Sequence, residues 1–250
     1  MVTARLLQDV AHGFTGIAAG DLRLFGTGGG PPPPVTPTPA ATDRLVARLG
    51  GHGPLVVVRQ VHGKTVVNAR SVAADTDADA ILSTTPGQVV AVRVADCVPV
   101  LLAAPGGVAA VHAGWRGTAA GITAASVRAL CSATGALPAQ IRAAVGPSIC
   151  PDCYEVGDDV VAGMRAVLPA DTDDRLWLRA GAAGRPHVDV ATVNVLVLEA
   201  LGVAVERVGG CSRCGTDAGG APLYWSHRRD PENGARQVGA IVCPPRPAPR

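Results

Sequence analysis

Aromatic residues, lysine and long apolar runs are scarce in this chain of 250 residues. Phe, Trp and Tyr make up only 3% of the sequence, so the core must be built mainly from Ala, Val and Leu. Lys64 is the only lysine, and the formal net charge of +2 is too close to neutral to favour nucleic acid or an anionic membrane as a partner. No apolar run reaches about 18 residues, so we expect no transmembrane helix.

We also expect no export signal, because the sequence does not open with a basic start followed by an apolar run. Seven cysteines occur without such a signal, and we therefore expect reduced thiols in a cytoplasmic protein. Hydrophobic residues make up 48% of the chain and charged residues 17%, a balance that excludes a disordered chain and supplies a substantial core. Nothing in the sequence indicates an obligate protein partner.

Strand and helix patterns mix irregularly along the chain, which predicts one α/β or α+β domain over residues 1–250. Predicted strands cover residues 55–61, 65–69, 88–94, 98–104, 108–111, 141–145, 176–179, 205–208, 223–226 and 237–242. Predicted helices cover residues 43–49, 119–130, 158–168 and 189–201. We expect a mobile Gly/Pro-rich loop at 26–42 and a frayed tail at 244–250.

The stretch from Val94 to Gly117 gathers reactive side chains on one predicted hairpin. Two apolar runs are joined by a Pro-Gly-Gly turn, which places Cys97 and His112 at the same end of the pair. Asp96 precedes the thiol, and Trp115 and Arg116 follow just beyond the imidazole.

Cys97, His112 and His62 form a candidate metal set. Three protein ligands with a fourth position open are typical of catalytic zinc, with Cu²⁺ as the competing metal. Asp96 would then support the site or accept a proton. Two alternatives stay open: a Cys97 thiolate nucleophile activated by one histidine, or a small buried Cys97 beside ordinary loop histidines.

Two further patterns carry charged side chains. Arg59, Arg116 and Arg228 lie near predicted strand ends or turns, where arginine binds phosphate or carboxylate groups or simply aids solubility. Residues 75–80 alternate Asp with small residues but lack the EF-hand glycine and glutamate, which favours a solvated loop or an acidic rim of a pocket.

Two C-x₂-C pairs, Cys150/Cys153 and Cys211/Cys214, together have the composition of a four-cysteine zinc site. Their separation is far longer than in a compact zinc ribbon, and glycines flank the second pair where a redox motif would begin a helix. We favour incidental thiols here, with a structural zinc as the open alternative.

Five motifs in order resemble the laccase-domain family, whose members are also called multicopper polyphenol oxidase-like proteins, peptidoglycan editing factors and purine nucleoside phosphorylases of the laccase-domain type. The motifs are R-Q-V-H-G, D-A-D-A-I-L, V-A-D-C-V-P-V-L-L, V-H-A-G-W-R-G-T and G-P-S-I-C-P-D-C-Y-E-V. The resemblance spans residues 55–242. It implies a single-domain α-β-β-α sandwich of four layers, with helices outside two inner sheets.

The resemblance also implies a zinc triad at His62, Cys97 and His112. The implied activity is phosphorolysis of adenosine, inosine, guanosine and methylthioadenosine, with deamination of adenosine beside it and nucleoside and phosphate as the small-molecule partners. Asp96 would handle protons, and Arg59 and Arg116 would bind phosphate. Editing of peptidoglycan precursors is the alternative function. Polyphenol oxidation is disfavoured, because six histidines in the chain are too few for a four-copper oxidase.

The chain departs from the family pattern at both ends. Residues 14–40 carry glycines and a proline tract in place of the family's G-G-V-S-type turn. His227 stands where the family favours tyrosine, and Val197 stands where glutamine is usual, although Arg228 and Arg229 match. We therefore expect a divergent member with an altered substrate preference.

Overall fold

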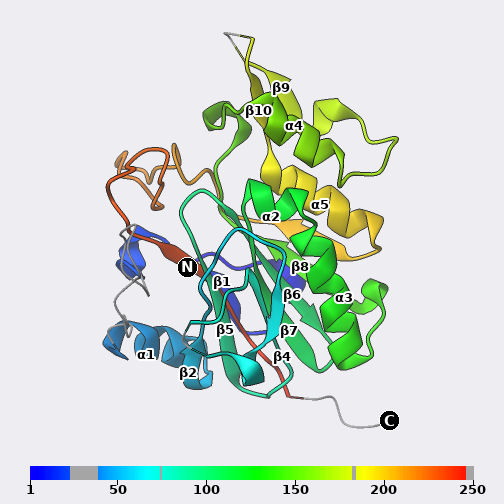
Figure 1. Cartoon of the computed structure of the whole chain (residues 1–250). Coiled ribbons are helices and arrows are strands. Elements are labelled where there is room, and N and C mark those ends of the chain that lie inside the picture. Colours follow the sequence, from blue (N-terminus) through cyan, green and yellow to red (C-terminus); the bar gives the residue numbers. More distant parts are fainter. Residues whose placement is uncertain (23–38, 74, 182–183, 246–250) are drawn as a thin grey trace.

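The computed structural model describes residues 1–22, 39–73, 75–181 and 184–245 (Figure 1). Two sheets form its centre. The first has the strand order β1-β12-β5-β2, and its strands are β1 (His12–Phe14), β12 (Gln237–Val242), β5 (Gln88–Val94) and β2 (His52–Val56). The second has the order β11-β8-β6-β7-β4-β3, and its strands are β11 (Ala204–Arg207), β8 (Arg142–Val145), β6 (Val98–Ala104), β7 (Gly107–Ala113), β4 (Ala80–Ser83) and β3 (Val66–Asn68).

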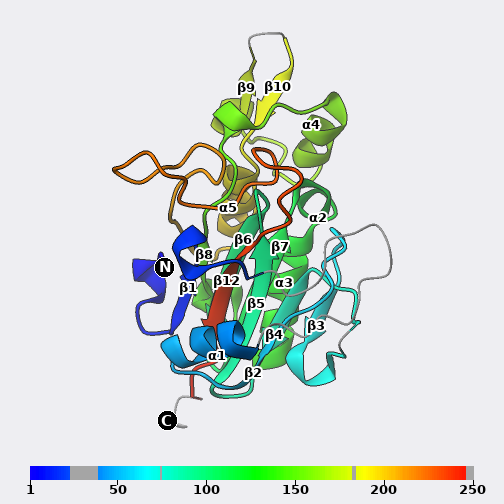
Figure 2. The same cartoon turned by 90° about the vertical axis from the view of Figure 1, so that its left-hand side faces the viewer.

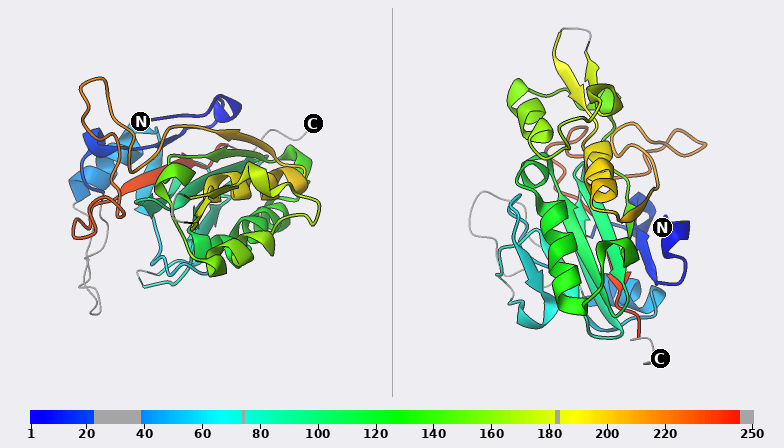
Figure 3. Two further views of the ribbon diagram at one scale, coloured as in Figure 1. Left: turned by 90° about the horizontal axis from the view of Figure 1, so that it is seen from above. Right: turned by 90° about the vertical axis from the view of Figure 1, so that its right-hand side faces the viewer.

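Helices cover the outer faces of both sheets (Figures 1 and 3). The helices are α1 (Pro39–Arg48), α2 (Trp115–Ala119), α3 (Ile122–Thr134), α4 (Asp158–Arg165) and α5 (Val190–Ala200). A small hairpin of β9 (Leu178–Ala180) and β10 (Pro186–Val188) protrudes from one end of the molecule (Figure 2). Among the described residues, none of the helices has both the length and the apolar character that crossing a bilayer requires.

Alternation along the central strands explains the layers. Val89 and Ala91 of β5 pack toward α1, whereas Val90 and Val92 pack toward the second sheet. In β6, Leu101 faces the first sheet while its neighbours on either side pack with α3 and α5. Successive side chains of a strand point to opposite faces, so strands buried on both faces need continuous apolar runs. The predicted four-layer α-β-β-α sandwich is confirmed.

The hairpin that carries the candidate site also forms as predicted. β6 and β7 pair antiparallel from Ala104↔Gly107 at the turn to Pro99↔His112 near the open end. Gly106 has a φ of 80°, and with a proline before it this is the geometry of a type II turn. Cys97 and His112 therefore lie at the same end of the hairpin.

Several predicted elements differ from the structure. The strand expected at 55–61 is β2, which ends at Val56 and is mostly exposed, because it lies at the sheet edge. The helix expected at 119–130 is divided between α2 and α3 at Gly121, whose φ is 84°. Residues 223–226 form no strand. The buried strand β4 was not predicted, and neither were β1 and β10, which have three residues each.

The predicted loop at 26–42 overlaps the start of α1, which begins at Pro39. The rest of that loop, residues 26–38, and the tail beyond 245 lie outside the described residues. Proline is favoured in the first turn of a helix, where its missing N–H has no partner to lose.

Candidate metal and active site

His62, Cys97 and His112 come together as the sequence predicts. Each offers one ligand atom, and these atoms all lie within 4.8 Å of one another. The Cys97 Sγ is 3.9 Å from the His62 Nε2, and the two imidazole rings meet edge to face with centroids 4.9 Å apart. His112 is buried at the end of β7, whereas His62 is exposed in the segment between β2 and β3. The site therefore opens to solvent on the His62 side.

The carboxylate of Asp79, which is fully buried, holds both histidines in place. Its Oδ1 accepts hydrogen bonds from the His112 Nδ1 at 2.8 Å and the His62 backbone N–H at 2.9 Å. Its Oδ2 accepts one from the Gly63 backbone N–H at 2.6 Å. A carboxylate that binds Nδ1 leaves the Nε2 of His112 free to act as a metal ligand.

Burial opposes ionisation of Asp79, but the hydrogen bonds from His112 and the two backbone amides outweigh it and lower its pKa. The prediction of a solvated loop or acidic rim at 75–80 is therefore wrong at Asp79. It holds at Asp77, which is exposed and paired with Arg59. The sequence signal was the apolar run Ala80-Ile81-Leu82 directly after Asp79, which forms the buried strand β4 and was not predicted as a strand.

Cys97 and His112 shift each other's protonation. Burial alone would raise the pKa of Cys97, but the charge of His112 and hydrogen bonds from both histidines lower it to about 6. Burial would lower the pKa of His112, but the Cys97 charge and the hydrogen bond to Asp79 raise it to about 9. A thiolate is therefore available at neutral pH, and the thiolate is the form of cysteine that binds a metal.

Two site residues have unusual backbone conformations. His62 has a φ of 60° and Asp96 a φ of 88°, and among the described residues no other non-glycine residue has a positive φ. Such conformations persist only when the surroundings hold them, and they cluster at functional sites. Asp79 holds the backbone of His62, and the carboxylate of Asp96 accepts hydrogen bonds at 2.6 Å from the Ser212 hydroxyl and the Arg228 backbone N–H.

The three predicted arginines lie in different settings. The Arg228 guanidinium lies 5.0 Å from the Tyr154 ring centre, and the Arg116 guanidinium stacks 4.5 Å from that of Trp115. Burial first, then the charge of Cys97, raises the pKa of Tyr154 to about 12, and the charges of Arg228 and Arg116 oppose the rise. Arg59 instead forms a two-pronged ion pair with Asp77.

Gly114 leaves room for the three ligands. A Cβ at this position would lie 3.0 Å from both the Cys97 Sγ and the His62 Cδ2, so a side chain here would push the ligands apart. Two imidazole nitrogens and one thiolate suit Zn²⁺, with Cu²⁺ as the competitor. The residues present therefore fit a single metal ion with an open position. Sequence reasoning did not find the supporting residues Asp79, Ser212 and Gly114.

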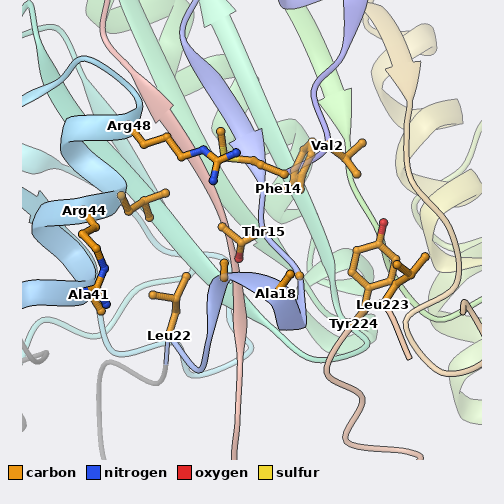
Figure 4. A pocket seen from close by; sticks show the side chains of 14 residues that line it. Val2, Phe14, Thr15, Ala18, Leu22, Ala41, Arg44, Arg48, Leu223 and Tyr224 are labelled. Carbon is orange, nitrogen blue, oxygen red and sulfur yellow. The ribbon is translucent and has the colours of Figure 1, made fainter. Parts of the chain in front are cut away.

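A cavity of about 660 Å³ lies elsewhere, against α1 and β1 (Figure 4). Its lining includes Phe14, Thr15, Arg44, Arg48 and Tyr224, and none of the three ligands. We place the candidate active site at the ligands, because polar groups with shifted pKa values converge there.

Fold and site together define a class: a mixed α/β protein of one domain with a candidate metal site of two histidines and one cysteine. The family model described as "Multi-copper polyphenol oxidoreductase laccase" matches residues 39–244. The chain belongs to this family.

Relatives in the family carry enzyme names. A purine nucleoside phosphorylase of Deinococcus radiodurans is 39% identical over 215 residues, covering 84% of this chain and 79% of that protein. The adenosine deaminase RL5 of an unknown prokaryotic organism is 39% identical and covers 64% of this chain and 66% of that protein. The crystal structure of YlmD from Geobacillus stearothermophilus matches with a TM-score of 0.75 and 28% identity, covering 97% of this chain and 94% of that one. The relatives support an enzyme of this kind.

Proposed function

We propose that this protein is a zinc-dependent purine nucleoside phosphorylase of the cytoplasm, with adenosine deaminase activity at the same site. Its substrates would be adenosine, inosine, guanosine and methylthioadenosine together with phosphate. The observation that carries the proposal is the convergence of His62, Cys97 and His112 within 4.8 Å, in a family whose relatives are named for these two reactions.

His62, Cys97 and His112 would hold the metal. When bound, the metal would act as a Lewis acid that polarises a water or phosphate oxygen. Asp79 keeps the proton of His112 on Nδ1 and fixes the direction of the ring. Asp96 directly precedes Cys97, and its carboxylate is the candidate proton carrier.

Phosphate needs an anion site, and the structure favours two arginines for it. The Arg228 backbone N–H donates to Asp96, the residue directly before Cys97, and Arg116 lies in α2, four residues after His112. Arg59 would first have to release Asp77. We therefore assign phosphate binding to Arg116 and Arg228 ahead of Arg59.

Copper-dependent phenol oxidation, which the family name carries, has little support in the donor set. The described residues contain two groups that could hold a metal, and only one of them includes histidine. The whole chain has six histidines. A four-copper oxidase needs many more imidazole ligands than this.

The test is a nucleoside assay on protein of known metal content. Inosine should yield hypoxanthine only when phosphate is present, whereas adenosine should yield inosine and ammonia without phosphate. His112→Ala should lose zinc from this site and both activities. His52→Ala changes an exposed histidine on β2 and is the matched control. A His112→Ala protein with full zinc and full activity, or a zinc-loaded wild type without either reaction, would overturn the proposal.

A further inference from the structure

A second cluster of thiols lies outside the site described above. It consists of Cys150, Cys153, Cys211 and Cys214, whose four Sγ atoms all lie within 4.8 Å of one another. All four are free thiols, the first three half-buried and Cys214 exposed. In the sequence, the two C-x₂-C pairs are much farther apart than the ligand pairs of a compact zinc ribbon.

The second sheet removes that objection. β8 and β11 are parallel neighbours, so their carboxyl ends meet at the same edge, and each is followed by one C-x₂-C pair. The strand register continues beyond the sheet: the Val208 N–H donates to the Val145 carbonyl at 2.9 Å, and the Ser212 N–H donates to the Ser148 carbonyl at 2.9 Å. The segment after β11 is orange in Figure 2. Residues far apart in sequence are thereby held side by side.

We propose that these four cysteines bind a structural zinc ion. Zinc bonds of about 2.3 Å to four tetrahedral sulfurs place those sulfurs about 3.8 Å apart. The Cys150 and Cys214 sulfurs are 4.0 Å apart, so only a small contraction is needed to enclose an ion. Four sulfurs without nitrogen or oxygen ligands select zinc or iron among biological metals.

The surroundings of the cluster include a backbone donor to sulfur and a positively charged side chain in the sequence between the cysteines. The Cys150 backbone N–H donates to the Cys211 Sγ at 3.3 Å. Arg213 stands between Cys211 and Cys214 in the second pair and brings a positive charge to this segment. Four thiolates around Zn²⁺ leave excess negative charge, and an adjacent arginine offsets part of it.

The ion would anchor the segment that supports the active site. Ser212 lies between the two cysteines of the second pair, is fully buried and donates to Asp96 at 2.6 Å. The Arg229 guanidinium donates to the carbonyls of Ser212 at 3.2 Å and Arg213 at 3.0 Å. The four-cysteine site would therefore hold two loops together, and Ser212 in the second loop binds Asp96.

Metal counting tests the proposal without any activity assay. Wild-type protein purified under reducing conditions should contain about two zinc ions per chain, one for each group. Cys214→Ser should lose about one, and His112→Ala should lose about one from the other group. Cys131→Ser, a half-buried thiol on α3, is the matched control and should keep both. If the proposed function failed because the histidine group binds no zinc, the single remaining zinc should still disappear in Cys214→Ser.

A folding readout distinguishes loss of the ion from collapse of the protein. Circular dichroism of Cys214→Ser should match the wild type, while trypsin should cut after Arg213 and Arg228 faster than in Cys131→Ser. Cobalt loaded into His112→Ala should give the thiolate charge-transfer absorption of a four-sulfur site, and Cys150→Ser should abolish it. Unchanged zinc in Cys214→Ser, iron in place of zinc, or two disulfides in the intact mass would overturn the proposal.

Discussion

At the scale of single residues, Asp79 is the support of the candidate metal site. It is buried, ionised and hydrogen-bonded to His112 and to the backbone of His62 and Gly63. Asp79→Asn keeps the shape but removes the charge, so zinc affinity should fall about 10- to 100-fold. The metal-free protein should lose about 3 kcal/mol of unfolding free energy, because a buried pair is broken. Competition titration and urea unfolding measure the two effects.

Asp77→Asn is the matched control for that prediction. Asp77 lies two residues from Asp79 in the sequence and pairs with Arg59. The relative exposures of the Arg59 and Asp77 side chains are 47% and 48%. Exposed ion pairs contribute little because solvent screens them, so zinc affinity and stability should stay close to wild type. Equal losses in both variants would show that Asp79 has no special role.

The Cys97 thiolate gives a pH-dependent prediction. The pKa of Cys97 is lowered to about 6 from 9.0, so its thiolate fraction should rise as pH increases through 6. Alkylation of Cys97 in metal-free protein should follow that curve, as measured by peptide mass spectrometry. His112→Ala removes the nearby positive charge and should move the midpoint upward, toward the ordinary thiol value. A midpoint unchanged by His112→Ala would contradict this account.

How far sequence predicts the site depends on what each residue contacts. His62, Cys97 and His112 were predicted as a set because ligand types at strand ends limit the choices. Asp79 was misassigned, because acidic residues alternating with small ones resemble a solvated loop, and only its tertiary contacts show that it is buried. Ser212 contacts Asp96, although the two residues are 116 positions apart in the sequence. No local sequence pattern predicts such a contact.

At the scale of elements, continuous apolar strands were predicted best. β5, β6 and β12 have the predicted bounds, because strands buried on both faces are nearly continuous apolar runs. Other strands were predicted less well: β4, although fully buried, was not predicted. β2 is mostly exposed, and the three-residue strands β1 and β10 are too short for a periodic signal.

Gly121 explains why one predicted helix forms two helices in the structure, and this explanation can be tested. It has a φ of 84° and separates α2 from α3, and a Cβ there would meet nothing within 4 Å. Gly121→Ala should therefore cost about 1 kcal/mol of unfolding free energy through backbone strain alone. Gly210→Ala also adds a Cβ in open space but at a φ outside the positive range, so it should not destabilise. Urea midpoints compare the two, and equal values would remove the explanation.

At the scale of the whole molecule, the four layers form because the two sheets pack face to face and helices cover their outer faces. The match to the family covers residues 39–244 and therefore leaves out the first strand. β1 nevertheless completes the first sheet, pairing with β12 from His12↔Ile241 to Phe14↔Gly239. In a chain with so few aromatic residues, this strand supplies one of the two phenylalanines.

Phe14 joins the two sheets, and its removal should weaken the whole molecule. The ring is 1% exposed and lies over two glycines, one from each side of the sandwich: a Cβ at Gly146 would lie 2.4 Å from it, and one at Gly239 would lie 3.0 Å from it. Phe14→Ala should cost about 3–5 kcal/mol of unfolding free energy, because removing the buried ring leaves a cavity between the sheets. Phe14→Leu should recover part of that loss. Leu137→Ala, at a side chain 67% exposed, is the control and should change little. Urea unfolding measures all three, and a loss in Phe14→Ala no larger than in Leu137→Ala would mean that β1 is not part of the cooperative core.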